Sequence, residues 1–201
     1  MKIVIIKYNA GNIRSVDFAL QRLGVSATVT ADPDEIRNAD RVIFPGVGEA
    51  STTMNYLRLH KLDSLICDLT QPVLGVCLGL QLMCAHSEEG DTQCLGIFPE
   101  KVKKFVPRNE NNILFKVPHM GWNSLSELKT SLFHNIREED YFYFVHSYYA
   151  ATGFDTAAIC DYIVPFSAAL QRDNFYATQF HPEKSGKTGA RILENFLNLK
   201  V

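Results

Sequence analysis

The N-terminal half of the chain alternates two hydrophobic periods, and this alternation limits the possible folds more than any other feature. Residues 2–8 form a nearly continuous apolar, β-branched run, which is typical of a strand covered on both faces. A turn is predicted at residues 9–11. Apolar residues then recur at helical spacing over 13–23, after Asn12 as a cap and before a terminating glycine. The pattern is one β-α unit.

Further units follow the first. Strands are predicted at 27–30, 41–44 and 72–76, with a helix capped at Asp32 and another running from the loop at 45–48 through Leu62. Such repetition favours a parallel sheet with helices on both faces. After about residue 95 the pattern changes to short alternating runs. These predict strands at 141–149, 157–163, 168–171 and 175–180, some antiparallel, and a last helix over 188–199.

No linker or repeat divides the 201 residues. We therefore predict one α/β domain over residues 1–201, with a mostly parallel central sheet flanked by helices and additional antiparallel strands in the C-terminal half. The net charge of -2, with both signs interspersed, argues against a nucleic-acid surface. The longest apolar run, residues 73–80, is too short to span a bilayer. The start resembles no signal peptide and the cysteines form no disulfide framework, so we expect a cytoplasmic protein.

The segment with the most chemical information is Gly75-Val76-Cys77-Leu78-Gly79, between a predicted strand and a predicted helix. Gly-X-Cys-X-Gly has the form of a nucleophile elbow with cysteine in place of serine. Such a turn would hold Cys77 at a helix N-terminus, which favours a thiolate, and would aim the Leu78 amide at an oxyanion. The alternative is that Cys77 is a small buried hydrophobe. Gln81, one helical turn on, would either reach a substrate or be solvated.

A nucleophilic cysteine needs a base, and His181 is the histidine best placed to be one. It ends the predicted strand 175–180 and is followed by Pro182-Glu183. In extended backbone, this spacing places imidazole and carboxylate on one side, where the carboxylate can fix the tautomer. Taken alone, the pair would be a surface His and Glu beside a strand-ending proline. Ordinary structural interpretations suffice for the other histidines, at positions 60, 86, 119, 134 and 146.

Glycines also follow the third predicted strand, at Pro45-Gly46-Val47-Gly48. Because ligands of open α/β sheets bind beyond the carboxyl ends of the strands, this peptide can supply a second oxyanion donor, although a simple β-α turn is the common alternative. The segment is no dinucleotide fingerprint, since Ser51 stands where glycine is needed, and Gly186-Lys187-Thr188 lacks the upstream glycine of a P-loop. No four-ligand cluster is evident, so we expect neither metal nor cofactor.

Two of these motifs together resemble one known family. Residues 75–81 (GVCLGLQ) with 180–183 (FHPE) resemble the class I glutamine amidotransferases, Cys-His-Glu hydrolases that release ammonia from glutamine. Within that family, residues 8–12, 118–123 and 141–148 look like the glutaminase subunits of imidazole glycerol phosphate synthases, of histidine biosynthesis. The likeness covers essentially the whole chain. Family members often carry Asp at the position of Lys7, a departure that we do not expect to affect the chemistry.

The resemblance implies a role for each matching residue. Cys77 would be the nucleophile, His181 the general base and then acid, and Glu183 the orienting carboxylate. The amides of Val47 and Leu78 would hold the oxyanion. The residues that would bind glutamine are Gly48, Gln81, Glu89 and the backbone of Ser147 and Tyr148. Those that would lie toward a partner cyclase are Met120, Trp122, Tyr143 and Lys184.

The activity implied by the resemblance is hydrolysis of glutamine through a γ-glutamyl thioester. The ammonia would pass to a cyclase subunit, in a heterodimer that makes imidazole glycerol phosphate and aminoimidazole carboxamide ribotide. Because unrestricted hydrolysis would waste glutamine, we expect the Gly46–Val47 peptide to be misaimed without the partner. Three alternatives stay open. They are a glutaminase subunit of the anthranilate or pyridoxal phosphate type, a solitary thiol hydrolase or peptidase, and a catalytically silent binding module.

Overall fold

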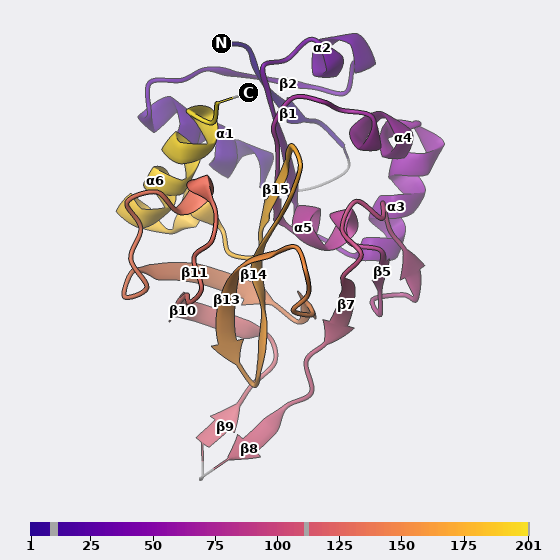
Figure 1. Cartoon of the computed structure of the whole chain (residues 1–201). Coiled ribbons are helices and arrows are strands. Elements are labelled where there is room, and N and C mark those ends of the chain that lie inside the picture. The colour runs from indigo at the N-terminus through magenta and orange to yellow at the C-terminus, as the bar shows by residue number, and fades with distance from the viewer. Residues whose placement is uncertain (9–11, 111–112, 201) are drawn as a thin grey trace.

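A seven-stranded sheet runs through the centre of the molecule (Figure 1). The structure is a computed structural model and describes residues 1–8, 12–110 and 113–200, so the turn predicted at 9–11 lies outside the described residues. The strands follow one another across the sheet in the order β13 (Thr156–Tyr162), β14 (Val164–Arg172), β15 (Phe175–Thr178), β4 (Val73–Cys77), β3 (Arg41–Gly46), β1 (Ile3–Ile6) and β2 (Ala27–Thr30). From β15 to β2 all neighbours are parallel, and β13, β14 and β15 pair antiparallel. The predicted fold class is confirmed.

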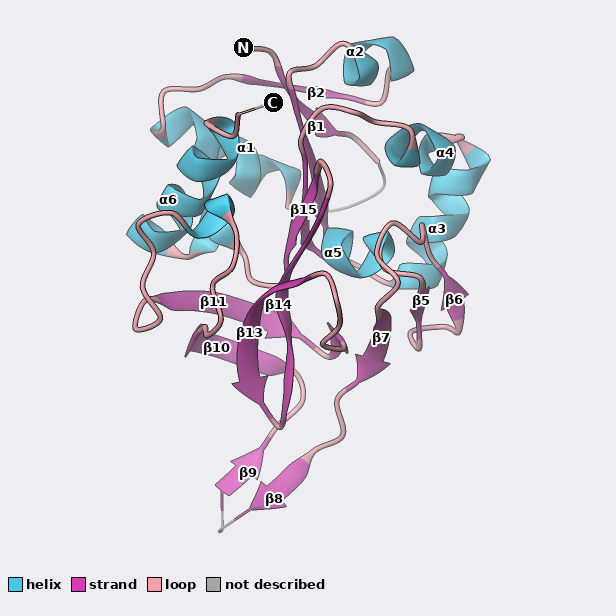
Figure 2. Cartoon of the chain, in the orientation of Figure 1, coloured by secondary structure: helices cyan, strands magenta, loops and turns pink. Residues whose placement is uncertain are grey.

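Helices cover both faces of this sheet (Figure 2). On one face lie α1 (Ile13–Arg22) and α6 (Gly186–Leu197), and on the other lie α3 (Ala50–Leu59), α4 (Leu62–Cys67) and α5 (Leu78–Met83). The short α2 (Pro33–Arg37) follows the edge strand β2. Within β1, Ile3 and Ile5 pack in the core on the α1 side while Val4 and Ile6 pack on the α3 side, as the period of two requires. The continuous apolar run is therefore buried on both faces.

One predicted helix and one predicted strand are each two elements. The helix predicted to run through Leu62 ends at Leu59, and Lys61, at a φ of 56°, breaks it before α4. The strand predicted at 141–149 is β11 (Tyr141–His146) and β12 (Tyr148–Ala150), which break at Ser147 and join different sheets. Both breaks arise from backbone turns that leave the hydrophobic pattern unchanged.

Small sheets cover the lower part of the molecule (Figure 1). A ribbon is formed by β10 (His119–Ser124) and β11. A four-stranded sheet has the order β12, β7 (Lys101–Lys104), β5 (His86–Ser87) and β6 (Thr92–Gln93). The hairpin β8 (Arg108–Glu110) and β9 (Ile113–Phe115) projects from the body. Single 3₁₀ turns occur at Ser131–Phe133 and Pro182–Lys184. Among the described ranges, no helix combines the length and apolar character needed to cross a membrane.

Candidate active site

Cys77 lies in the sharp turn between β4 and α5, as the elbow motif predicts. Its backbone has φ 55° and ψ -107°, a conformation that residues with a side chain rarely adopt. The flanking glycines leave room for neighbouring atoms, most strictly at Gly79. A Cβ at Gly79 would lie 2.2 Å from the carbonyl oxygen of Phe44, and one at Gly75 would lie 2.8 Å from Sδ of Met83. Tight packing of β4, α5 and β3 therefore fixes the position of the thiol.

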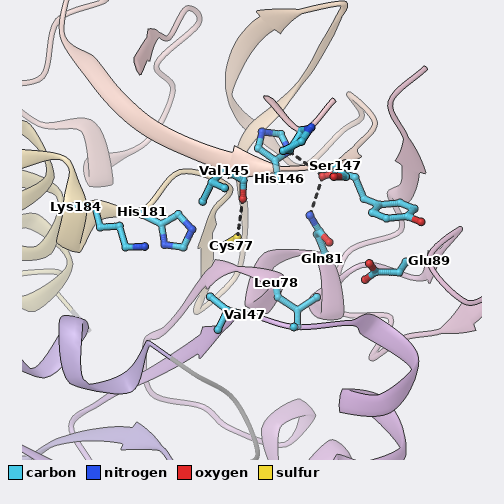
Figure 3. A pocket seen from close by; sticks show the side chains of 13 residues that line it. Val47, Cys77, Leu78, Gln81, Glu89, Val145, His146, Ser147, His181 and Lys184 are labelled. Atoms are coloured by element: carbon cyan, nitrogen blue, oxygen red, sulfur yellow. Dashed lines mark hydrogen bonds between the residues drawn. The ribbon is translucent and has the colours of Figure 1, made fainter. Parts of the chain in front are cut away.

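The surroundings of the Cys77 sulfur come from three segments of the chain, two of which, at Val47 and Val145, are labelled in Figure 3. The side-chain amide of Gln179 donates to Sγ at 3.7 Å, and the carbonyl oxygen of Val145 lies 4.0 Å from it. In the parallel register of β3 and β4, Gly46 is paired with Cys77, so Val47 follows immediately beside the nucleophile. The sheet edge thus brings the two glycine-containing turns together.

His181 and Glu183 form a buried hydrogen bond. Nδ1 of His181 lies 2.7 Å from Oε1 of Glu183, and each side chain is only 1% exposed. The predicted pairing is confirmed, but its predicted geometry is wrong. Residues 182–184 form a 3₁₀ turn rather than extended backbone, and the turn brings the carboxylate back under the ring. Because Nδ1 faces the carboxylate, Nε2 is left for other chemistry.

The imidazole of His181 lies beside the Cys77 sulfur in Figure 3. Its Nε2 is buried and has no hydrogen-bond partner among the described residues. Burial alone would lower the pKa of His181, but the negative charge of Cys77 and the hydrogen bond with Glu183 outweigh burial and raise this pKa to about 10. The site therefore favours the protonated, imidazolium form of His181.

Asn12 has a different role from the predicted helix cap. It adopts the left-handed conformation, with φ 72°, and its side chain makes no capping hydrogen bond. Its Nδ2 instead donates to Oε1 of Glu183. A helix cap would accept backbone N–H groups through Oδ1, but the side chain is oriented so that Nδ2 donates to the buried carboxylate and Oδ1 caps no helix amide. The start of α1 is thereby joined to the His181–Glu183 pair.

A cavity of about 350 Å³ opens over Cys77. It contains the proposed nucleophile and base, both proposed oxyanion residues, all five residues proposed to bind glutamine, and Lys184. Glu183 lies behind His181, outside the lining. The full lining is Val47, Gly48, Cys77, Leu78, Gln81, Glu89, Pro118, Val145, His146, Ser147, Tyr148, His181 and Lys184. Segments separated by more than a hundred residues therefore share one small space.

Two polar side chains stand at the far side of this cavity from His181 (Figure 3). Gln81 donates through Nε2 to the carbonyl of Tyr148 at 2.8 Å and to Oε1 of Gln179 at 3.0 Å. Both of its amide hydrogens are thus used, and its carbonyl oxygen is the group left to meet a ligand. Glu89 accepts the backbone N–H of Ala50 at 2.8 Å, and burial raises the pKa of Glu89. Both groups suit a ligand that carries an ammonium.

Sequence reasoning missed Tyr8 and Gln179. The buried hydroxyl of Tyr8 donates to the carbonyl of Pro45, which anchors the start of the loop that carries Val47. Burial, followed by the charge of Cys77, raises the pKa of Tyr8, so this hydroxyl keeps its proton. A signal existed for Gln179, because it stands two residues before His181 and the period of a strand aims both the same way. The role of Tyr8 depends on contacts between distant segments.

The four residues expected to face a partner lie together on the ribbon and the adjoining turn. Met120 is 68% exposed and Trp122 is 55% exposed. Trp122 packs edge-on against Tyr143, with ring centroids 5.9 Å apart, and Nζ of Lys184 lies 5.9 Å from the Tyr143 centroid. The carbonyl of Tyr143 accepts the backbone N–H of His181 at 2.9 Å. A single backbone hydrogen bond, between Tyr143 and His181, therefore connects this exposed surface to the proposed base.

Sequence comparison places these motifs among known proteins. The family described as Glutamine amidotransferase class-I matches residues 4–199. A protein of Bacteroides thetaiotaomicron named Imidazole glycerol phosphate synthase subunit HisH is 61% identical over 199 residues, covering 99% of this chain and 100% of that protein. Proteins of the same name from Pasteurella multocida and Idiomarina loihiensis are 46% and 43% identical, covering 98% and 100% of both chains respectively.

Solved structures share the fold at low sequence identity. A protein from Thermoplasma acidophilum, described as a GMP synthase subunit, has a TM-score of 0.74 and 22% identity, covering 98% of this chain and 92% of that one. PurLQS from Thermotoga maritima has a TM-score of 0.67 and 14% identity, covering 98% and 97%. At identities this low, the likeness shows a shared fold and nothing further.

Proposed function

The chain belongs to the class I glutamine amidotransferases, and from this membership we propose that it is the glutaminase subunit of an imidazole glycerol phosphate synthase, acting in histidine biosynthesis. It hydrolyses glutamine to glutamate and ammonia and delivers the ammonia to a cyclase subunit. The observation that carries the proposal is that Cys77 and His181 line one cavity while the buried Glu183 holds the His181 ring from behind. Five free cysteines fit a reducing compartment, so we place the reaction in the cytoplasm.

The Cys77 thiolate attacks the side-chain carbonyl carbon of glutamine, and the carbonyl electrons move to oxygen. The resulting oxyanion lies where the amides of Leu78 and Val47 are proposed to donate. Support for this placement comes from the register that pairs Gly46 with Cys77 and from the start of α5 at Leu78. Collapse of the tetrahedral intermediate breaks the C–N bond and leaves a γ-glutamyl thioester on Cys77.

His181 moves the protons of both steps. As an imidazolium, which its raised pKa of about 10 favours at neutral pH, it protonates the departing nitrogen so that ammonia leaves. The neutral ring then takes a proton from a water molecule, which attacks the thioester. Collapse of the second tetrahedral intermediate breaks the C–S bond and releases glutamate and the Cys77 thiolate, with His181 again an imidazolium. Glu183 holds Nδ1 throughout, so Nε2 is the nitrogen that exchanges protons.

Glutamine is oriented by its amino-acid head. Glu89 and the free carbonyl oxygen of Gln81 receive its ammonium, and the backbone amides of Gly48, Ser147 and Tyr148 receive its carboxylate. The support for these roles is that all five residues line the cavity around Cys77. A zwitterion needs both kinds of group, because either charge buried without a partner would cost several kcal/mol, on the order of 3–5.

The cyclase docks over Met120, Trp122, Tyr143 and Lys184. Exposed Met and Trp side chains are typical of interface cores, and this patch borders the cavity through Lys184. Ammonia formed at His181 would then leave toward the docked cyclase, not toward bulk water. A partner contact at Tyr143 also reaches the backbone of His181, which offers a route for activation.

The test is to mix the purified chain with its cyclase partner and measure glutamate release, with and without the cyclase's phosphoribulosyl ligand. We expect little release from the chain alone and strong stimulation by the loaded complex. Rapid partner-free turnover would support a solitary hydrolase instead. Stimulation by an anthranilate or pyridoxal phosphate synthase in place of this cyclase would reassign the partner.

A further inference from the structure

Two buried histidines, His146 in the lining of the active-site cavity and His119 outside that lining, have no part in the proposed chemistry. His119 in β10 and His146 in β11 are paired directly across the ribbon, and they are 3% and 6% exposed. Nδ1 of His119 lies 3.0 Å from Nε2 of His146. The His119 ring is stacked between Phe144, at 4.8 Å, and Tyr162, at 4.0 Å between centroids. The aromatic rings therefore fix the plane in which His119 can donate.

The partners of these rings settle which nitrogen carries hydrogen. Nδ1 of His146 lies 2.8 Å from the carbonyl oxygen of Tyr148, which can only accept, so Nδ1 carries the hydrogen. Burial lowers the pKa of His146 to about 3, and the ring is neutral at physiological pH. Nε2 of His146 is then an acceptor, and Nδ1 of His119 must be the donor to it. The hydrogen bonds run in one direction, from His119 through His146 to Tyr148.

The carbonyl of Tyr148 connects this pair to the nucleophile. It also accepts Nε2 of Gln81 at 2.8 Å. The same Gln81 nitrogen donates to Oε1 of Gln179 at 3.0 Å, and Nε2 of Gln179 donates to the Cys77 sulfur at 3.7 Å. A continuous series of hydrogen bonds thus joins β10 to the reacting atom. Both amides acquire a fixed orientation because the Tyr148 carbonyl is held in place.

Packing alone does not account for the two histidines. They are surrounded by the rings of Phe105, Phe144 and Phe166, where apolar side chains would fill the same volume without burying polar nitrogens. In addition, each imidazole supplies one hydrogen-bond donor and one acceptor at fixed positions. The bend at 146–148 is the break that sends β11 and β12 into different sheets, so that His146 lies at the end of one ladder and Tyr148 at the start of another. Besides the backbone hydrogen bond from the N–H of Phe105 to the carbonyl of Ser147, at 3.0 Å, the His146–Tyr148 hydrogen bond spans the break.

We propose that His119 and His146 are positioning residues for glutamine hydrolysis: as an uncharged, one-directional pair they hold the 146–148 bend, and through Gln81 and Gln179 they set the substrate-binding groups relative to the Cys77 sulfur. The proposal rests on the proposed glutaminase activity. It assigns the pair no contact with the reacting atoms of the substrate and no proton transfer.

Two variants of His146 distinguish the loss of its hydrogen bond to Tyr148 from the loss of its side-chain volume. In His146→Asn the side-chain amide occupies the place of Nδ1 and can still donate to the Tyr148 carbonyl, whereas in His146→Gln it extends to the place of Nε2 and leaves that carbonyl short of a donor. With the cyclase and its ligand present, we expect His146→Gln to raise KM for glutamine about 5–20-fold, with a smaller fall in kcat, and His146→Asn to restore most of the loss. His119→Phe keeps a stacked ring and removes the donor, and we expect an intermediate KM.

A labelling experiment on the same complexes gives a second readout. A diazoketone analogue of glutamine needs the binding groups in order to alkylate Cys77, while iodoacetamide needs only the thiol. We expect His146→Gln to slow the analogue and not iodoacetamide. Equal KM in His146→Gln and the native chain, or equal losses in the Asn and Gln variants, would overturn the pair's role. If the native complex itself releases no glutamate, the proposed function fails, and the two failures are thus distinguishable.

Discussion

Asn12 donates its side-chain amide to Oε1 of Glu183, 171 positions later in the chain. The same oxygen accepts Nδ1 of His181 at 2.7 Å, so one carboxylate oxygen joins the first helix to the proposed base. The other oxygen, Oε2, is buried and has no hydrogen-bond partner among the described residues. The Glu183 carboxylate is therefore oriented through one oxygen only, by a donor before α1 and a donor after β15.

Changing Asn12 tests that orientation. Asn12→Asp places a second carboxylate against Glu183, and like charges at this distance disfavour both ionised forms, so we expect kcat/KM for glutamine to fall about tenfold or more. Asn12→Gly keeps the φ of 72° without strain and loses only the donor, so a smaller loss of a few-fold is expected. Steady-state glutamate release and thermal melting measure the two effects. Native kinetics in the Asp variant would contradict the assigned role.

Cys77→Ala should abolish glutamine-dependent synthesis, because no other thiol lines the cavity among the described residues. The cyclase partner should still form product when ammonium salt replaces glutamine. The matched control is Cys84→Ala, which removes a buried thiol on the opposite side of the sheet and should leave the glutamine reaction in place. If Cys77→Ala loses both reactions while the complex still forms, Cys77 has a structural role.

The titration of His181 should depend on Cys77. Burial lowers the pKa of His181, and the neighbouring Cys77 charge is the first of the influences that raise it to about 10. Removing the sulfur in Cys77→Ala should therefore move this pKa downward. NMR of ring-labelled histidine in both proteins, between about pH 5 and 10, measures the change. An unchanged or higher pKa in the variant would show that the two groups are not coupled.

Acid should destabilise the protein through the buried histidine pair. Burial lowers the pKa of His119 to about 4 and that of His146 to about 3. Unfolded histidines titrate near 6.5, so below that pH the unfolded chain binds protons that the folded chain refuses. The stability from these rings is present above about pH 6.5 and is lost as pH falls toward about 4 for His119 and about 3 for His146, at up to about 1.4 kcal/mol per pH unit for each ring. Denaturant unfolding at several pH values should show a shallower slope for His119→Phe.

Gly79→Ala should unfold or severely destabilise the chain. The added Cβ would lie 2.2 Å from the Phe44 carbonyl oxygen, and both elements are buried backbone that cannot move apart without loss of packing. We expect a cost above about 3 kcal/mol. Gly24→Ala is the control, because its Cβ would meet nothing within 4 Å and only the φ of +76° opposes it, at about 1 kcal/mol. Similar melting temperatures for the two variants would refute the steric argument.

Local patterns determined much of this protein in advance. The β-branched runs gave the parallel strands, since a strand buried on both faces must be apolar at every position, as Ile3–Ile6 is. The Gly-X-Cys-X-Gly spacing predicted the turn at Cys77, because a side chain at Gly79 would collide with β3 and one at Gly75 would crowd α5. The His181–Glu183 pairing was also predictable, since the partners are two residues apart and their bond needs only a local turn.

What the tertiary structure decided are the contacts between distant segments. No local pattern foretold that Asn12 would leave its helix to bind Glu183, that Tyr8 would anchor Pro45, or that the strand at 141–149 would break at Ser147. A hydrogen bond between residues more than thirty positions apart depends on how sheets and helices pack. Where a side chain is compatible with several local roles, it takes the role that satisfies a buried polar partner. For that reason the elements and the nucleophile follow from the sequence, and the groups that orient them follow from packing.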